Sequence, residues 1–283
     1  MKLVRFGPRG REKPGLIDDG GNLRSLEKRV PDITSKVLSD KGLERLARIN
    51  PARLPKVTGR PRVGVPVADI GKIVCIGLNY IDHAKEVGAA IPEEPIVFMK
   101  PTSALNGPND IVEMPKGSKK SDWEIELGVV IGTAANNVPK SRALQHVAGY
   151  TVVNDVSERE WQIERGMTWD KGKGCDTFCP VGPWMVTRDE IRNPQRLNLW
   201  MDVNGKRMQD GNTSTMIFDV RTLVSYISKF MTLYPGDLIA TGTPPGVGSG
   251  MKPPLFLKQD DVMEPGIEGL GAQRQKVRKW AAR

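Results

Sequence analysis

The order of apolar and polar residues along the chain predicts many short strands and few long helices. Apolar runs rich in Val and Ile, bounded by Gly, Pro, Asn or Asp, occur at residues 72–77, 96–100, 121–132 and 150–155. Such runs are typical of buried strands, because β-branched side chains pack well on a pleated surface. Asn204 and Gly205, between segments 197–203 and 206–208, predict a tight β-hairpin.

Helical spacing is confined to short segments. Leu43, Leu46 and Ile49 recur on one helical face, and Pro51 ends that segment. Asp219 is placed to cap a helix whose inner face is expected to carry Val220, Leu223, Val224, Ile227 and Phe230. Because strands dominate and do not alternate with long helices, the pattern favours a β-rich α+β fold over a doubly wound nucleotide-binding fold.

Composition divides the chain into three regions. Residues 1–66 combine short strands with turn residues and end in a linker rich in Pro, Gly and basic residues. This region carries no convergent set of polar side chains, so we expect a small α+β domain that serves packing or dimerisation. Residues 67–273 are expected to form the main domain, and the basic residues 274–283 a frayed or partner-facing tail.

The formal net charge of +9 lies at the two ends of the chain. Residues 1–62 contain 16 Lys and Arg against 7 Asp and Glu, and residues 274–283 contain five Lys and Arg and no acidic residue. The aromatic residues do not alternate with basic ones as platforms for base stacking would. We therefore expect no nucleic-acid partner, although a basic N-terminal region can raise the local concentration of an anionic substrate.

Nothing in the sequence predicts a membrane span or an oxidising compartment. No stretch approaches 18 consecutive apolar residues, and the first residues lack the apolar run of a signal peptide. The three cysteines, Cys75, Cys175 and Cys179, form an odd and sparse set that does not indicate a disulfide framework. A cytoplasmic location with no membrane partner is therefore expected.

Glu124 and Glu126 stand two residues apart in the apolar run 121–132. In a strand, residues i and i+2 point to the same face, so both carboxylates are expected to point to one spot. They repel each other unless a positive charge lies between them. Asp155, at the end of the run 150–155, is a third candidate ligand. Three oxygen ligands without His or Cys suit a hard divalent ion such as Mg²⁺, Mn²⁺ or Ca²⁺; a solvated sheet face is the alternative.

The chain contains two histidines. His83 lies in a short helix predicted at residues 81–86, and Glu86 follows three residues later on the same helical face, so imidazole and carboxylate can touch. His146 lies between a helical segment and a strand, and a structural role is expected there. Without further context, a structural role is also the alternative for His83.

Five motifs occur in a fixed order along the chain. They are Gly77-Leu-Asn-Tyr-x-Asp-His-Ala-x-Glu86, Glu124-x-Glu126, Asn154-Asp155-Val-Ser157 with Arg159 and Gln162, Gly172-Lys173 with Asp176, and Thr241-Gly-Thr-Pro-Pro-Gly-Val-Gly248. In this order the chain resembles the fumarylacetoacetate hydrolase family from about residue 72 to residue 271. The resemblance implies a catalytic domain at 67–273 with a fumarylacetoacetase-like mixed β-sandwich roll, a divalent metal such as Mg²⁺, and a homodimer.

The resemblance also implies roles for individual residues. Glu124, Glu126 and Asp155 would hold the metal, His83 with Glu86 would act as the general base, and Lys173 would be a fixed cation beside the metal. The remaining positions, Arg159, Gln162, Asp176 and Thr243, would contact the substrate. Without the resemblance, residues 157–169 would be interpreted as an exposed helix and residues 241–248 as a plain turn.

The expected reaction is hydrolysis of the C3–C4 bond of a 2,4-dioxo acid. Water can cleave this bond when the departing carbanion is stabilised as an enolate, which a metal ion and a fixed cation at the C2 oxygen achieve. The resemblance implies a hydrolase that converts a 2,4-diketo-3-deoxy sugar acid, a small-molecule carboxylate, to pyruvate and a second acid. Ureidoglycolate lyase or oxaloacetate decarboxylase activity is the alternative, and the complete set of catalytic residues disfavours a non-catalytic binding protein.

Overall fold

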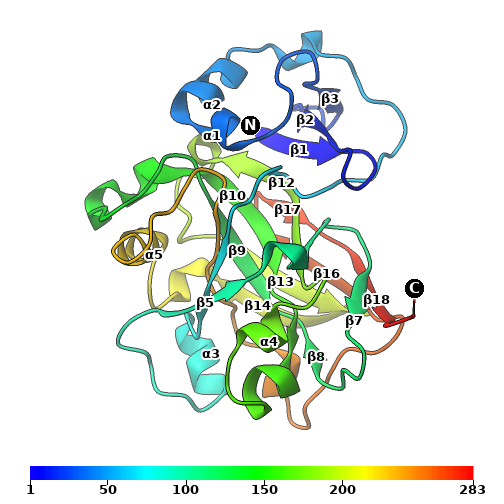
Figure 1. Cartoon of the computed structure of the whole chain (residues 1–283), viewed down its shortest axis with the longest axis vertical. Coiled ribbons are helices and arrows are strands. Elements are labelled where there is room, and N and C mark those ends of the chain that lie inside the picture. The colour runs from blue at the N-terminus through cyan, green and yellow to red at the C-terminus, as the bar shows by residue number, and fades with distance from the viewer. Residues whose placement is uncertain (283) are drawn as a thin grey trace.

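The computed structural model of the protein describes residues 1–282 and contains a ten-stranded mixed sheet (Figure 1). In chain order its strands are β1 (Lys2–Phe6), β2 (Lys13–Ile17), β3 (Leu23–Ser25), β4 (Ile73–Gly77), β5 (Ile96–Lys100), β6 (Leu105–Asn106), β9 (Ile125–Ile131), β10 (Val147–Asn154), β12 (Cys179–Thr187) and β15 (Leu238–Ala240). They are ordered β3-β2-β1-β12-β10-β9-β15-β4-β5, and β6 pairs with β12. The four apolar runs of the sequence form β4, β5, β9 and β10, which confirms them as strands.

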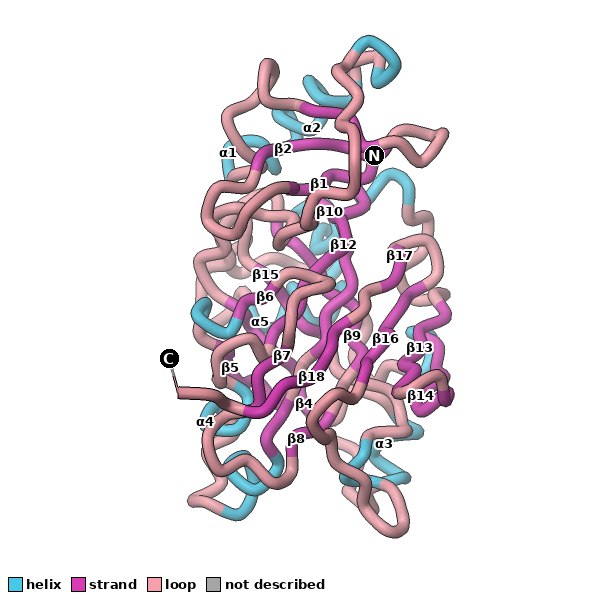
Figure 2. Tube along the Cα trace, turned by 90° about the vertical axis from the view of Figure 1, so that its right-hand side faces the viewer, coloured by secondary structure: helices cyan, strands magenta, loops and turns pink. Residues whose placement is uncertain are grey.

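The second sheet has six strands and lies against the first (Figure 2). Its strands are β7 (Val112–Met114), β13 (Asn198–Val203), β14 (Lys206–Asn212), β16 (Val262–Ile267), β17 (Gly271–Ala272) and β18 (Gln275–Lys279). The predicted hairpin joins β13 to β14, and both of its turn residues, Asn204 and Gly205, have positive φ. The tail prediction was wrong for residues 275–279, because β18 pairs with both β16 and β7.

The N-terminal region extends the first sheet instead of forming a sheet of its own. Strand β1 pairs antiparallel with β12, with Lys2 opposite Val186, and β2 and β3 continue outward (Figure 1, blue). Leu3 packs in one buried cluster with Cys75 and Met185 of the main body. Helices α1 (Ser35–Leu38) and α2 (Asp40–Ala47) also contribute to this cluster. The region expected at residues 1–66 therefore shares a sheet and a core with residues 67–273.

Strand β9 separates two buried clusters. Its odd-numbered residues, from Ile125 to Ile131, point into a cluster that also contains residues of the second sheet, as the alternation predicts. On the even face, Val130 packs into the other cluster, and Gly128 lies close against β10: a Cβ there would be 2.7 Å from Val153 Cγ2. The candidate carboxylates Glu124 and Glu126 have the even-numbered positions that correspond to this face.

The remaining elements are short and lie around the sheets. Besides several 3-10 helices, they are the two-stranded sheet of β8 (Ser121–Asp122) and β11 (Ser157–Glu158), a π-helical turn at Glu160–Glu164, and helices α3 (Ile81–Glu86), α4 (Asp170–Lys173) and α5 (Val220–Ile227). The Asp219 side chain caps α5 by accepting from the Thr222 N–H. Phe230 was predicted on the inner face of α5, but the helix ends at Ile227 and the Phe230 side chain is 53% exposed. No helix in the described part of the chain is long and apolar enough to cross a bilayer.

Candidate active site

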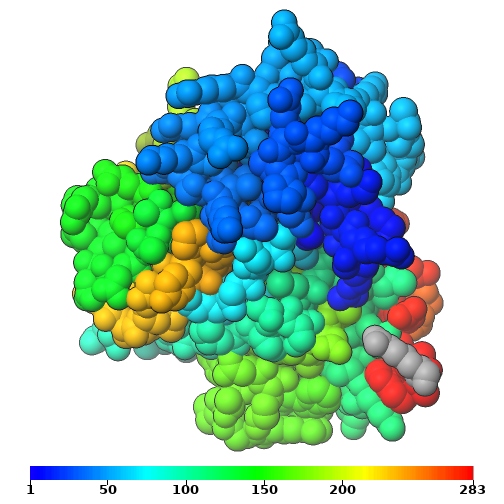
Figure 3. Space-filling view, turned by 45° about the horizontal axis from the view of Figure 1, so that its top comes forward, coloured from blue at the N-terminus to red at the C-terminus, as the bar shows by residue number. Residues whose placement is uncertain are grey.

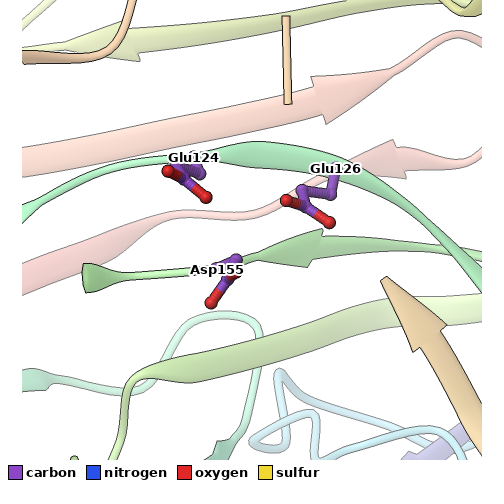
Figure 4. Close-up of side chains that lie close together, drawn as sticks. All are labelled: Glu124, Glu126 and Asp155. Atoms are coloured by element: carbon purple, nitrogen blue, oxygen red, sulfur yellow. The ribbon is translucent and has the colours of Figure 1, made fainter. Parts of the chain in front are cut away.

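Three carboxylates meet where β9 begins and β10 ends (Figure 4). Glu124 immediately precedes β9, Glu126 lies in β9 opposite Val153, and Asp155 immediately follows β10. The Asp155 N–H donates to the Glu124 carbonyl oxygen at 2.8 Å, which holds the two strand ends together. All three residues are buried, and one carboxylate oxygen from each lies within 4.8 Å of the others. The sequence therefore predicted both the shared face and the third carboxylate.

Three buried cations surround the carboxylates. Lys173 Nζ lies 2.6 Å from Glu124 Oε2 and 2.8 Å from Asp155 Oδ2, and Lys100 Nζ lies 2.5 Å from Asp155 Oδ1. Arg159 Nη2 lies 2.6 Å from Glu124 Oε1. Lys100 was missed in the sequence, where it reads as the last residue of a strand. The available signal was its charge at the end of an otherwise apolar run, because a buried lysine requires a partner.

The cations and carboxylates set each other's protonation. Burial alone would lower the pKa of Lys173, but Asp155 and Glu124 outweigh burial and raise it, so the ammonium stays charged. Burial alone would raise the pKa of Glu124, but Lys173 and Arg159 outweigh burial and lower it. The pKa of Glu126, in contrast, is well above its ordinary value because of burial and the neighbouring Asp155 and Glu124 charges.

Glu126 is the carboxylate beside which a further positive charge fits. The Gly242 N–H donates to its Oε2 at 2.8 Å, and within residues 1–282 Glu126 forms no ion pair. Three oxygen donors facing one point are the ligand set of a hard divalent cation. Such an ion would offset the repulsion that raises the Glu126 pKa, so the residues present fit a divalent metal.

Arg159 connects the carboxylates to the cavity wall. Its Nε donates to Asp122 Oδ2 at 2.8 Å and its Nη1 to Gln162 Oε1 at 3.0 Å. Asp122 in turn accepts from the N–H groups of Gly248 and Ser249. The Arg159 guanidinium is therefore largely engaged by protein partners, and Gln162, which it orients, is the more available polar group of the two.

Helix α3 brings the histidine to the same cavity. His83 Nδ1 lies 2.8 Å from Glu86 Oε2, as the i,i+3 spacing predicted, and the Gly246 N–H donates to the other oxygen of Glu86 at 2.8 Å. Glu86 thus links α3 to the loop at residues 241–248. With Nδ1 facing a carboxylate, Nε2 is the ring nitrogen left to exchange a proton with a substrate or water.

A cavity of about 210 Å³ joins these groups. Its polar lining includes His83, Glu124, Glu126, Arg159, Gln162, Lys173, Thr243 and Ser249, and its apolar lining includes Ile76, Leu78, Val87, Phe98, Ile163 and Trp169. The Thr243 hydroxyl donates to the Ile125 carbonyl oxygen and accepts from Gln209, so its hydrogen is already used within the protein. Asp155 and Glu86 do not line the cavity, but they contact the lining residues Lys173 and His83, respectively.

The structure does not bring Asp176 to this cavity. Its side chain is exposed and lines a separate depression with Lys116, Trp161 and Trp280. The short helix α4 ends at Lys173, and the chain turns away after it, so Lys173 points inward and Asp176 outward. His146 likewise lies elsewhere: its Nδ1 is 2.9 Å from the Ala134 carbonyl oxygen, which is consistent with a structural role.

One cavity of this β-rich fold is lined by buried carboxylates, a lysine and a histidine, which are groups that enzymes use for acid–base and metal-assisted chemistry. A family model described as fumarylacetoacetate (FAA) hydrolase C-terminal matches residues 72–278. A protein of Burkholderia orbicola (strain MC0-3), provisionally named a hydrolase, is 60% identical over 279 residues, which are 98% of this chain and 99% of that protein. The chain belongs to the fumarylacetoacetate hydrolase family.

Two solved structures show the same fold over the full length of the chain. The fumarylacetoacetate hydrolase of Exiguobacterium antarcticum is 36% identical with a TM-score of 0.89, and the match covers 99% of this chain and 100% of that chain. The maleylpyruvate hydrolase of Sphingobium sp. SYK-6 is 28% identical with a TM-score of 0.82, and the match covers 99% and 100%. The predicted fold class and family resemblance are therefore confirmed.

Proposed function

We propose that this enzyme hydrolyses the C3–C4 bond of a 2,4-dioxo acid with the help of a divalent metal ion. The observation that carries the proposal is a single cavity lined by Glu124, Glu126, Lys173 and His83, with Asp155 beside the two glutamates and Glu86 hydrogen-bonded to the histidine. The reaction adds water to the C4 carbonyl, breaks the C3–C4 bond, and yields a carboxylic acid and pyruvate. One related structure is that of a maleylpyruvate hydrolase. The name maleylpyruvate denotes an acylpyruvate, and acylpyruvates are 2,4-dioxo acids.

Glu124, Glu126 and Asp155 would hold the metal, which when bound supplies Lewis-acid stabilisation of negative charge on the substrate oxygens. The Lys173 ammonium, kept charged by Glu124 and Asp155, provides a second fixed positive charge. Such a charge favours the enolate formed as C3–C4 breaks over the neutral ketone, because its interaction with the substrate strengthens as charge develops. Proton return to C3 then gives the methyl group of pyruvate.

The attacking water requires a base in the same cavity. His83 Nε2 takes a proton from this water as it adds to C4, and Glu86, hydrogen-bonded to Nδ1, fixes the tautomer and stabilises the imidazolium. The Gly246 N–H holds the second Glu86 oxygen and so keeps the pair in one orientation.

The distal part of the substrate would lie against the mainly apolar wall that includes Val87, Phe98, Ile163 and Trp169. Gln162 and Ser249 are the polar groups there that can meet a hydroxyl. Our finer proposal is that the substrate is a 2,4-diketo-3-deoxy sugar acid, whose hydroxyl groups would bind these two side chains. An unsubstituted acyl chain would instead contact only the apolar wall.

The test is product identity in a substrate panel. Purified enzyme with Mg²⁺ is given a diketo-deoxy sugar acid, a simple acylpyruvate, oxaloacetate and ureidoglycolate, and the products are identified by mass spectrometry. We expect one pyruvate for each dioxo acid consumed and no CO₂. Dominant CO₂ release from oxaloacetate, or glyoxylate and urea from ureidoglycolate, would instead assign a decarboxylase or lyase.

The same assay tests the metal. Glu126→Gln removes one ligand charge while keeping the side-chain shape, and it should abolish turnover, as should a chelator acting on the wild type. Glu93→Gln, on an exposed residue outside the cavity, is the matched control and should retain activity. Full turnover by Glu126→Gln in the presence of chelator would refute the assignment.

A further inference from the structure

A second cavity lies in the N-terminal region, apart from the active site. It has a volume of about 530 Å³ and is bounded by the segment 28–37, helix α2 and the residues that follow it. This region is the blue surface at the top of the molecule in Figure 3. None of the lining residues also lines the catalytic cavity.

The charged residues of this second cavity all have one sign. Its lining contains Lys28, Arg29, Lys36, Arg45 and Arg48 and no Asp or Glu. All five side chains are exposed, and within residues 1–282 none of them forms an ion pair. Like charges around one concavity repel and raise the local positive potential, which attracts an anion.

Two of the neighbouring carboxylates are engaged elsewhere. Asp32 pairs with Arg5 at 2.8 Å, and Asp40 pairs with Arg188 at 3.0 Å. Helix α2 separates the charges by face: Asp40 and Glu44 line a depression that also contains Arg188, whereas Arg45 lines the basic cavity. The surrounding sequence does contain acidic residues. Those of helix α2 are absent from the basic cavity because the helix turns them toward another face.

The floor of the basic cavity is apolar and tightly built. Val37 and Leu46 line it and are 8% and 3% exposed, and Val30 and Ile49 extend it. Gly42 allows α1 and α2 to approach closely, because a Cβ there would lie 2.4 Å from the Val37 carbonyl oxygen. A cavity with an apolar floor and a charged rim is the usual form of a small-molecule site.

We propose that this cavity binds a small phosphate-bearing ligand with a compact apolar part. The five cations face the phosphate oxygens, and the apolar floor takes the organic group. Arginine favours this chemistry, because its planar guanidinium can donate two hydrogen bonds to one phosphate. The volume suits a molecule of metabolite size, and the ligand occupies this cavity without entering the active site.

Isothermal titration at low salt tests the proposal with three probes: isopentyl diphosphate, pyrophosphate and isopentanol. Wild-type enzyme should bind the ester about tenfold more tightly than pyrophosphate, as burial of about two methylene groups implies, and isopentanol should not bind. Arg45→Glu with Arg48→Glu should weaken binding of the ester at least tenfold. Turnover without the probe should be unchanged, because neither residue lies at the active site.

Two controls make the result specific. Lys206→Glu with Lys229→Glu makes the same change in net charge at exposed residues outside the cavity, and binding should stay within twofold of wild type. Arg45→Gln with Arg48→Gln is a milder pair for use if the reversal lowers the melting temperature. No ester binding by the wild type, or an equal loss in the Lys206 and Lys229 pair, would overturn the proposal. Tighter binding of a single-stranded oligonucleotide that depends on Arg45 and Arg48 would also overturn it, in favour of a polymer.

Discussion

The two cavities hold positive charge in opposite ways. In the active site, Lys100, Arg159 and Lys173 are buried, and each contacts at least one carboxylate within 2.8 Å. In the N-terminal cavity, five exposed cations have no acidic neighbour in the lining. Solvent explains why both can exist: a buried charge needs a partner, whereas an exposed charge is screened by water and salt.

The difference also indicates how each region can be used. The buried network is fixed before any ligand arrives, so its charges can act on a reacting substrate without reorganising. The exposed cluster is flexible in its side chains and can adapt to a ligand, but it loses side-chain freedom on binding. The first arrangement suits catalysis and the second suits reversible recognition.

The largest expected effect comes from breaking the buried network. Lys173→Ala leaves Glu124 and Asp155 short of a positive charge, and loss of one partner from a buried ion pair costs about 3–5 kcal/mol of stability. Turnover should fall below detection. Arg45→Ala, the matched change in the exposed cluster, should alter the free energy of unfolding by less than about 0.5 kcal/mol. Urea denaturation with Mg²⁺ absent measures both, and equal effects would refute the contrast.

The next effect concerns the His83–Glu86 pair of α3, which is not part of the buried cation network. His83→Ala should lower kcat at least about a hundredfold, since general-base catalysis contributes that much or more. Glu86→Ala should have a similar effect and the double variant little more, because the two residues act as one unit. Asp82→Ala, on the exposed face of the same helix, is the control. Additive losses in the double variant would show that Glu86 does not act through His83.

The smallest effect is a pH dependence of Mg²⁺ binding. Because burial, Asp155 and Glu124 raise the pKa of Glu126 above its ordinary value of 4.5, a proton competes with the ion at every pH below the raised pKa, including the window between pH 4.5 and that pKa. Affinity should rise about tenfold per pH unit in that window and level off above it. Without metal, stability should fall as pH rises through the same window, since the folded state holds the proton more tightly. Titrations in buffers of different ionisation enthalpy should detect proton release, and pH-independent binding would contradict it.

The parts of the site that follow from local periodicity were predictable from the sequence. The i,i+2 spacing of Glu124 and Glu126 and the i,i+3 spacing of His83 and Glu86 each place two side chains on one face whatever the rest of the fold does. The strands and the hairpin followed in the same way, because their apolar patterns and turn residues are local.

The parts that depend on distant contacts could not be predicted. Lys100, the last residue of β5, reaches Asp155 although β5 and β10 are not paired strands, and no spacing in the sequence encodes that contact. Residues 275–279 of the tail pair with β7, more than 160 residues earlier in the chain. The local sequence gives no sign of that partner, so a frayed tail was predicted. The convergence of Lys28 and Arg45 likewise depends on how the segment 28–37 packs against α2, and the sequence showed only an excess of charge.

The pairing of β1 with β12 has a consequence for synthesis. Lys2 lies opposite Val186, so β1 meets β2 early but must wait for β12, which is made much later. At translation rates of about 5–20 residues per second, that wait lasts about 10–40 seconds. Leu3, which lies in one buried cluster with Met185 in the folded protein, lacks that partner on the nascent chain during this interval. The segment from Lys2 to Phe6 is therefore a candidate early contact for ribosome-associated chaperones, and slower translation would prolong its exposure to aggregation.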